Sequence, residues 1–189
     1  VGRWMMREAM GKCSEIRKVL PDFRVSINIS QVQASKSDVI KDISAEMKRA
    51  GLPLEALIVE LTESDLLEQN INEKHFLTEL RRMGISLALD DFGTGYSNFH
   101  YLSELHPDIV KIDRGFTSKA ITDKNEYYLL NQFSNMIHNL GLKLCIEGIE
   151  TEDELQKMKL LKPDYCQGFY WGRSCPYDEF RKHFVDVDR

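Results

Sequence analysis

The sequence has no apolar run that approaches the roughly 20 residues needed by a membrane-spanning helix, so we expect no membrane contact by this domain. It also has no excess of basic residues: 25 Lys and Arg stand against 30 Asp and Glu, and the formal net charge is −5. Binding to DNA or RNA through phosphate neutralisation needs a basic face, so neither is expected as a partner. A small phosphate ester held by metal ions is compatible with this charge.

Cysteine and histidine are few and scattered. The four cysteines contain no C-x-x-C pair, the five histidines contain no H-x-x-x-H pair, and no histidine lies near a cysteine at zinc-binding spacing. We therefore expect reduced thiols, a cytoplasmic protein and no zinc site. The apolar fraction of 42% and charged fraction of 29% are typical of a folded globular domain.

Strand-like and helical patterns alternate along all 189 residues. Apolar, β-branched runs predict strands at 24–30, 57–62, 85–90, 108–112, 142–146 and 165–168. Helical periodicity predicts helices at 3–20, 36–50, 72–83, 98–105, 125–140 and 152–161, with a last helix beyond Pro176. The first helix is expected to bury one apolar face, formed by Trp4, Met5, Ala9, Cys13, Ile16 and Leu20. This order predicts an α/β fold with a parallel sheet, either an open doubly wound sheet or a closed (β/α)₈ barrel.

Nearly every predicted strand ends in a side chain that can ligate a metal or move a proton. In order along the chain these are Asn28, Glu60, Asp90 with Asp91, Lys111 with Asp113, Glu147, and Gln167. A single polar residue at a strand end is commonly a helix cap, but six successive strands with such ends indicate an active site, because parallel strands bring their carboxyl ends to one face. Carboxylate and amide oxygens suit Mg²⁺ or Mn²⁺. Two such ions can activate a water for attack on a phosphate ester, with Asp90 and Asp91 supplying the shared carboxylates.

These motifs resemble the EAL-domain family of bacterial cyclic di-GMP phosphodiesterases. The matching segments are Asn28 within Ile-Asn-Ile-Ser, Glu60-Leu-Thr-Glu63, Asp90-Asp91-Phe-Gly-Thr-Gly-Tyr-Ser97, Lys111-Ile-Asp113, Glu147-Gly-Ile-Glu150 and Gln167-Gly168. They follow the family's order over almost the whole chain. The resemblance implies a TIM-like (β/α)₈ barrel, with about six of the eight strands in this chain. It also implies hydrolysis of cyclic di-GMP to linear pGpG by a water that two metal ions, Mg²⁺ or Mn²⁺, activate.

The resemblance further implies a role for each matching residue. The metal ligands are expected to be Asn28, Glu60, Asp90 and Asp91, and the catalytic residues Lys111 and Glu147, which position or deprotonate the water. Gln167, Asp113 and Glu150 are expected to support the site. The family's regulatory loop, which links the metal site to dimerisation, corresponds to Glu63, Phe92, Gly93, Thr94 and Gly95.

Two segments depart from the family pattern. The family is named for a Glu-Ala-Leu motif whose glutamate is a metal ligand. The Glu-Ala-Leu string at 55–57 lies at the amino edge of a predicted strand, which is the wrong end for a metal ligand, so we do not assign it as that motif. The sequence opens inside a predicted helix, and we expect residues 1–189 to be an EAL-like domain that is incomplete at its N-terminus. The second departure is Gly172-Arg173-Ser174-Cys175-Pro176, which has Ser and Cys where the family tends to have Pro and Leu.

Three functions fit this sequence. The first is an active phosphodiesterase domain, expected to be a homodimer and to be fused to, or regulated by, other signalling domains. The second is an inactive EAL-like module that binds cyclic di-GMP or a protein partner, and the third is an unrelated barrel metalloenzyme. The family's Glu-Ala-Leu motif, whose glutamate is implied to be a metal ligand on an early strand, is expected upstream of residue 1. A glutamate at that motif would favour the first function, and another residue there would favour the second.

Overall fold

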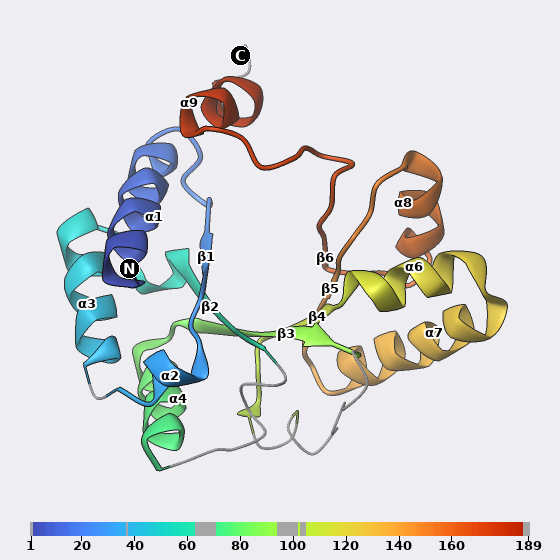
Figure 1. Ribbon diagram of the computed structural model, residues 1–189, viewed down its shortest axis with the longest axis horizontal. Helices are drawn as coiled ribbons and strands as arrows, with labels where there is room; N and C mark the ends of the chain where they lie inside the picture. The colour runs from blue at the N-terminus through green and yellow to red at the C-terminus, as the bar shows by residue number, and fades with distance from the viewer. Residues whose placement is uncertain (1, 37, 63–70, 94–101, 103–104, 187–189) are drawn as a thin grey trace. The chain divides into compact units, whose positions relative to one another are not determined.

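The computed structural model describes residues 2–36, 38–62, 71–93, 102 and 105–186 (Figure 1). The chain divides into two compact units. Unit 1 contains the described residues within 1–60, 68–86 and 174–189, and unit 2 contains those within 61–67 and 87–173. Each unit is built on parallel strands with helices beside them.

Unit 1 is built around the parallel pair β1 and β2, in which Asn28 lies opposite Glu60. Helix α1 packs against α3 and β1, and α4 contacts α2 and α3. The elements with residues in this unit are α1 (Gly2–Arg17), β1 (Val25–Asn28), α2 (Gln31–Ala34), α3 (Val39–Ala50), the 3₁₀ turn η1 (Leu54–Ala56), β2 (Leu57–Thr62), α4 (Ile71–Met83), α9 (Tyr177–Phe180) and the π-helical turn η3 (Arg181–Val185). The Glu-Ala-Leu string thus falls on η1 and the first residue of β2, at the amino end of that strand, as predicted.

Helix α1 buries Cys13 and Ile16 as predicted, but the rest of its buried face differs from the prediction. Its buried residues are Met6, Met10, Cys13 and Ile16. Trp4 and Met5 are 66% and 58% exposed, so their assignment to the apolar face was wrong. Ion pairs from two arginines near the start of the helix to α3 accompany this orientation.

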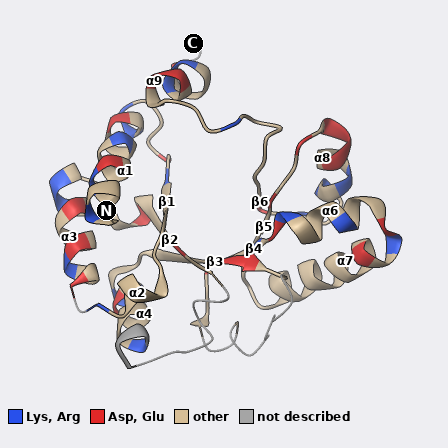
Figure 2. Cartoon of the chain, viewed as in Figure 1, with Lys and Arg blue, Asp and Glu red and all other residues tan. Residues whose placement is uncertain are grey.

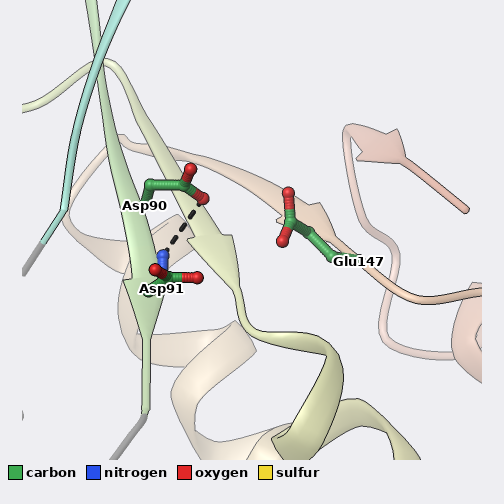
Figure 3. Close-up of side chains that lie close together, drawn as sticks. All are labelled: Asp90, Asp91 and Glu147. Atoms are coloured by element: carbon green, nitrogen blue, oxygen red, sulfur yellow. Dashed lines mark hydrogen bonds between the residues drawn. The ribbon is translucent and has the colours of Figure 1, made fainter. Parts of the chain in front are cut away.

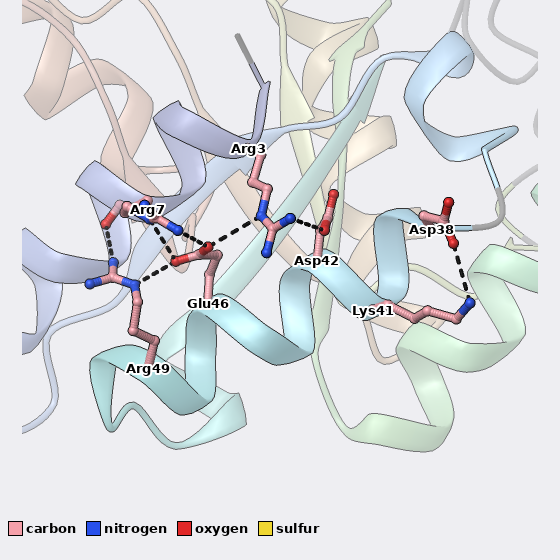
Figure 4. A network of polar contacts seen from close by, with 7 residues as sticks. All are labelled: Arg3, Arg7, Asp38, Lys41, Asp42, Glu46 and Arg49. Atoms are coloured by element: carbon pink, nitrogen blue, oxygen red, sulfur yellow. Dashed lines mark hydrogen bonds and ion pairs between the residues drawn. The ribbon is translucent and has the colours of Figure 1, made fainter.

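Those ion pairs converge on Glu46, whose side chain is only 2% exposed (Figure 4). Its carboxylate accepts hydrogen bonds from Arg49 at 2.6 Å, from Arg7 at 3.1 Å and from Arg3 at 3.4 Å. The three guanidinium groups lower the pKa of Glu46 to about 2. The network therefore joins α1 to α3 through one buried charge that is fully paired.

The C-terminal segment of unit 1 contacts α1 and the turn after it. The Tyr177 hydroxyl donates to Glu15 at 2.8 Å, and the ammonium of Lys12 lies 4.2 Å from the centre of the Tyr177 ring. Phe180 packs edge-to-face on Phe23 with ring centres 6.2 Å apart. Aromatic contacts and one charge-assisted hydrogen bond therefore hold α9 in place.

Unit 2 contains four parallel strands in the order β3, β4, β5, β6, with α7 against β5 and α6 against both α7 and α8. Every residue of β4 is buried. The elements that lie wholly or mainly in this unit are β3 (Ser86–Phe92), β4 (Ile109–Ile112), α6 (Arg114–Thr122), α7 (Lys124–Asn139), β5 (Lys143–Ile146), α8 (Glu152–Lys159) and β6 (Tyr165–Cys166). Asp113, Asp123 and Thr151 cap the amino ends of α6, α7 and α8 with their side chains.

All six predicted strands and the parallel α/β arrangement are confirmed. The short helices α2 and α6 were not predicted, and the predicted helix at 98–105 lies mostly outside the described residues. Among the residues that the structure describes, none of the helices combines the length and the apolar character needed to cross a membrane.

Candidate active site

Three carboxylates meet at the carboxyl ends of the strands of unit 2 (Figure 3). Asp90 and Asp91 lie near the carboxyl end of β3, and Glu147 directly follows β5. One oxygen from each side chain lies within 4.8 Å of the other two. In Figure 3 the Glu147 carboxylate points across toward Asp90 and Asp91, and acidic residues mark this end of β3 in red in Figure 2. The three residues form what we call the acidic cluster.

Lys111 joins two members of the acidic cluster. It lies on β4, between β3 and β5, and its side chain is 7% exposed. Its ammonium is 2.9 Å from an Asp90 oxygen and 2.7 Å from a Glu147 oxygen. A buried ammonium between two carboxylates is held in one position, ready to donate a hydrogen bond to a bound group.

A bulge in β3 allows consecutive aspartates to face the same site. Leu89 is opposite Val110 and Phe92 is opposite Ile112, so β3 has one residue more than β4 between these two pairs. The extra residue adopts a left-handed conformation at Asp91, with φ of 56°. Its amide donates to the Asp90 carboxylate at 3.0 Å. The bulge therefore explains how two consecutive residues of one strand both reach the acidic cluster.

The electrostatics of the acidic cluster favour a cation. Burial raises the pKa of Asp91, and the negative charges of Asp90 and Asp113 raise it further, whereas Lys111 lowers it. One lysine does not balance three carboxylates, and oxygen ligands at this spacing are those that Mg²⁺ and Mn²⁺ prefer. The donor set therefore fits a hard divalent ion.

The predicted supporting residues Asp113, Glu150 and Gln167 each have contacts of their own. Asp113 caps α6 by accepting from the amide of Gly115 at 2.7 Å, so part of its role is structural. Glu150 forms an ion pair with Arg114 at 2.5 Å. Gln167 is exposed, and its backbone continues the β5–β6 ladder by donating to Ile146. Arg114 directly follows the Lys111-Ile-Asp113 motif in the sequence, but it was not among the predicted site residues.

The other two predicted metal ligands lie in unit 1. Asn28 and Glu60 are opposite each other at the ends of β1 and β2, so the parallel pair places both at one edge. Glu60 is buried and Asn28 is exposed. Their assignment as metal ligands stays a prediction.

The predicted regulatory loop is described at its start only. Phe92 is buried and packs edge-to-face on Phe133. Gly93 has φ of 102°, and a Cβ there would lie 2.7 Å from the ring of Phe116. These two residues anchor the end of β3 against α6 and α7, and the remaining loop residues Glu63, Thr94 and Gly95 lie outside the described residues.

Residues 1–174 match the EAL domain family. The chain belongs to the EAL domain family. MucR of Pseudomonas aeruginosa, a bifunctional diguanylate cyclase/cyclic di-GMP phosphodiesterase, is 31% identical to the EAL chain over 183 residues, which are 95% of this chain and 26% of MucR. The probable cyclic di-GMP phosphodiesterase PdeD of Escherichia coli is 30% identical over 94% of this chain and 34% of its own length.

The EAL chain also superposes on a solved EAL structure. A cyclic di-GMP complex of the PaMucR phosphodiesterase matches 95% of the chain and 73% of that structure, with 29% identity and a TM-score of 0.87. This match confirms the predicted TIM-like fold class. The chain spans only about a quarter to a third of the length of the two relatives named above.

Proposed function

We propose that this EAL domain hydrolyses one phosphodiester of cyclic di-GMP to give linear pGpG. The observation that carries the proposal is the acidic cluster with Lys111 between two of its members, in a chain of the EAL family. MucR and PdeD, whose names include this activity, support the choice of substrate.

The acidic cluster would hold the metal ions through Asp90 and Asp91, and Asn28 and Glu60 are further proposed ligands. When bound, two Mg²⁺ or Mn²⁺ ions would supply a water of lowered pKa and would neutralise the charge that develops on the phosphate. The carboxylate that both ions share is proposed to be that of Asp90.

The residues of this chain would then position and deprotonate the water. Glu147 would accept the proton, because its carboxylate faces the two aspartates. Lys111 would donate a hydrogen bond to the attacking oxygen or to the phosphate, and its contacts with Asp90 and Glu147 keep its ammonium in place. Asp113 and Glu150 would fix the segments that follow β4 and β5, and Gln167 would act at the end of β6.

We also propose a cytoplasmic homodimer in which this domain is joined to other signalling domains. The length of the relatives supports the last point, because the chain covers only 26% of MucR and 34% of PdeD. The loop that begins at Phe92 and Gly93 is the proposed route between the site and the dimer contact. Sedimentation of the full-length protein at several concentrations would test the dimer.

The proposed reaction is tested by incubating the full-length protein with cyclic di-GMP and Mn²⁺ and separating the products by chromatography. Asp90→Asn removes a charge from the acidic cluster, and Asp153→Asn, on the exposed first turn of α8, is the matched control. We expect linear pGpG from the wild type and the control, and none from Asp90→Asn or after addition of EDTA. Unchanged cyclic di-GMP with the wild type would contradict the proposal.

A further inference from the structure

A short sequence pattern occurs twice in unit 2, each time directly before a strand that leads to a predicted site residue. Residues 105–108 read Leu-His-Pro-Asp and precede β4, and residues 161–164 read Leu-Lys-Pro-Asp and precede β6. The aspartate that ends each copy lies three positions before the site residue, which is Lys111 in the first case and Gln167 in the second. The proposed function assigns no role to either aspartate.

The two copies also share one backbone conformation. The second residue of each copy is left-handed, with φ of 41° at His106 and 55° at Lys162. The leucine before it is buried in both copies. The pattern therefore builds the same turn twice, with a buried leucine on one side and an aspartate on the other.

In each copy the aspartate brackets one residue of the preceding strand. The Asp108 amide donates to the Leu87 carbonyl at 2.8 Å, and the Asp108 carboxylate accepts from the Leu87 amide at 2.8 Å. Asp164 makes the same pair of hydrogen bonds with Leu144, both at 2.9 Å. We call the two hydrogen bonds between Asp108 and Leu87 the β4 clamp. Leu87 is buried, so removal of the carboxylate takes an acceptor from a buried amide.

Asp108 also contacts the strand on the other side of β4. Its carbonyl accepts from the amide of Lys143, the first residue of β5, at 3.0 Å. The same three strands meet again at their carboxyl ends, where Lys111 contacts Asp90 of β3 and Glu147 after β5. Asp108, just before β4, and Lys111, near its end, therefore join this strand to the same two neighbours.

The register of β4 decides which groups the Lys111 ammonium reaches. Two residue pairs lie between the β4 clamp and the bulge in β3, Ala88 with Ile109 and Leu89 with Val110. A slip of one residue would move Lys111 by about 3.3 Å along the strand and turn its side chain to the other face of the sheet. Such a shift would separate the ammonium from both carboxylates, which it contacts at 2.9 Å and 2.7 Å.

We propose that Asp108 is a positioning residue for the hydrolysis. By fixing β4 between β3 and β5, its carboxylate holds the Lys111 ammonium at the acidic cluster. The inference rests on the proposed function, in which Lys111 donates a hydrogen bond to the attacking oxygen or to the phosphate. Asp108 acts through Lys111 and does not itself contact the substrate.

Steady-state kinetics of pGpG formation by the full-length protein with Mn²⁺ test this inference. Asp108→Ala removes the acceptor from the Leu87 amide, and we expect kcat to fall at least about tenfold with little change in KM, because small displacements of a catalytic group are costly. Asp108→Asn should retain most of the wild-type kcat, because its amide oxygen can accept the same hydrogen bond. Asp108→Glu places its carboxylate one methylene farther from the backbone and should also lower kcat.

The matched control is Asp123→Ala. The Asp123 side chain also accepts hydrogen bonds from backbone amides, those of Asn125 at 2.7 Å and Glu126 at 3.0 Å, but these cap the start of α7. Both alanine variants should lose stability, whereas Asp108→Ala alone should lose kcat at a temperature at which both are folded. Equal kcat values for the two variants would overturn the inference.

A double-mutant cycle shows whether Asp108 acts through Lys111. If it does, Asp108→Ala should have no further effect on kcat in protein that already carries Lys111→Met. Two independent effects would multiply instead, and a multiplied loss of kcat would overturn the inference.

Hydrogen–deuterium exchange of the metal-free protein supplies a readout that does not depend on turnover. Asp108→Ala should speed exchange in β3 and β4, and Asp123→Ala should leave both strands as in the wild type. Unchanged exchange in Asp108→Ala would overturn the β4 clamp. Wild-type kcat in Asp108→Ala would overturn the positioning role and leave the proposed function intact, whereas absence of pGpG formation by the wild type would overturn both.

Discussion

Replacement of Glu46 by glutamine tests how the charge network of α1 and α3 stabilises unit 1. The change keeps the shape of the side chain and removes the charge that three arginines share. Lowering the pKa from its ordinary value of 4.5 to about 2 corresponds to about 3.4 kcal/mol, at about 1.36 kcal/mol per pKa unit. The arginine side chains are 45–58% exposed, so solvent screening reduces the expected loss to about 1–2 kcal/mol.

Thermal unfolding followed by circular dichroism measures this loss. For a chain of this length 1 kcal/mol lowers the Tm by about 2–4 °C, so we expect Glu46→Gln to lower it by about 3–6 °C at pH 7. Because the folded-state pKa is lowered, the stabilisation is complete above pH 4.5 and is lost as the pH falls toward 2. The difference between wild type and Glu46→Gln should therefore shrink below pH 4.5.

The matched control is Glu79→Gln, which removes one i,i+3 partner of Arg82 on α4. The Arg82 side chain is 70% exposed, so solvent screens this ion pair and the Tm should not change measurably. Equal effects of the two substitutions, or a Glu46→Gln difference that is as large at pH 3 as at pH 7, would refute the reasoning from the buried, triply paired charge.

Three further predictions concern unit 2. Lys111→Met should lower kcat for cyclic di-GMP at least about 100-fold while changing its Kd far less, because we propose that the lysine acts on the attacking water or the phosphate. Steady-state kinetics and calorimetry on the variant measure both. Gly93→Ala should lower the free energy of unfolding, measured by chemical denaturation, by about 2–3 kcal/mol, because Gly93 has φ of 102° and a Cβ there would clash with Phe116. Gly141→Ala should lower it by about 1 kcal/mol, because Gly141 has φ of 75° but open space around it. Asp113→Ala should cost about 1 kcal/mol in the same assay through the lost cap of α6, and no loss would mean that the cap is not stabilising.

The strand ends could be predicted because the argument needs only periodicity and chain direction. Asp90, Lys111 and Glu147 close three successive apolar runs, and parallel pairing brings such ends together whatever the details of packing. In the structure the Lys111 ammonium contacts the carboxylates of both Asp90 and Glu147, so the three strand ends converge as predicted. The position of Asp91 could not be derived in the same way, because the bulge depends on the register of β3 against β4.

The errors in the predicted helices concern the buried face of α1 and the missing helix α6, and both depend on contacts with other helices. Trp4 and Met5 are apolar, but the pairing of Arg3 and Arg7 with α3 accompanies a rotation of α1 that exposes them. Helix α6 has a glycine and two threonines in nine residues, so its own helix propensity is low. Its packing on α7 and α8 is a tertiary contact that the local sequence does not reveal, whereas the capping Asp113 directly precedes the helix in the sequence.

Hydrolysis in ¹⁸O-labelled water tests the central claim most directly. The full-length protein is incubated with cyclic di-GMP and Mn²⁺ in labelled water, and the product is weighed by mass spectrometry beside that of Asp90→Asn. Water attack at a single phosphodiester predicts linear pGpG that carries one labelled oxygen with the wild type, and no product with Asp90→Asn. Unlabelled product, or equal amounts of labelled product from both proteins, would contradict the assignment of the acidic cluster as the hydrolytic site.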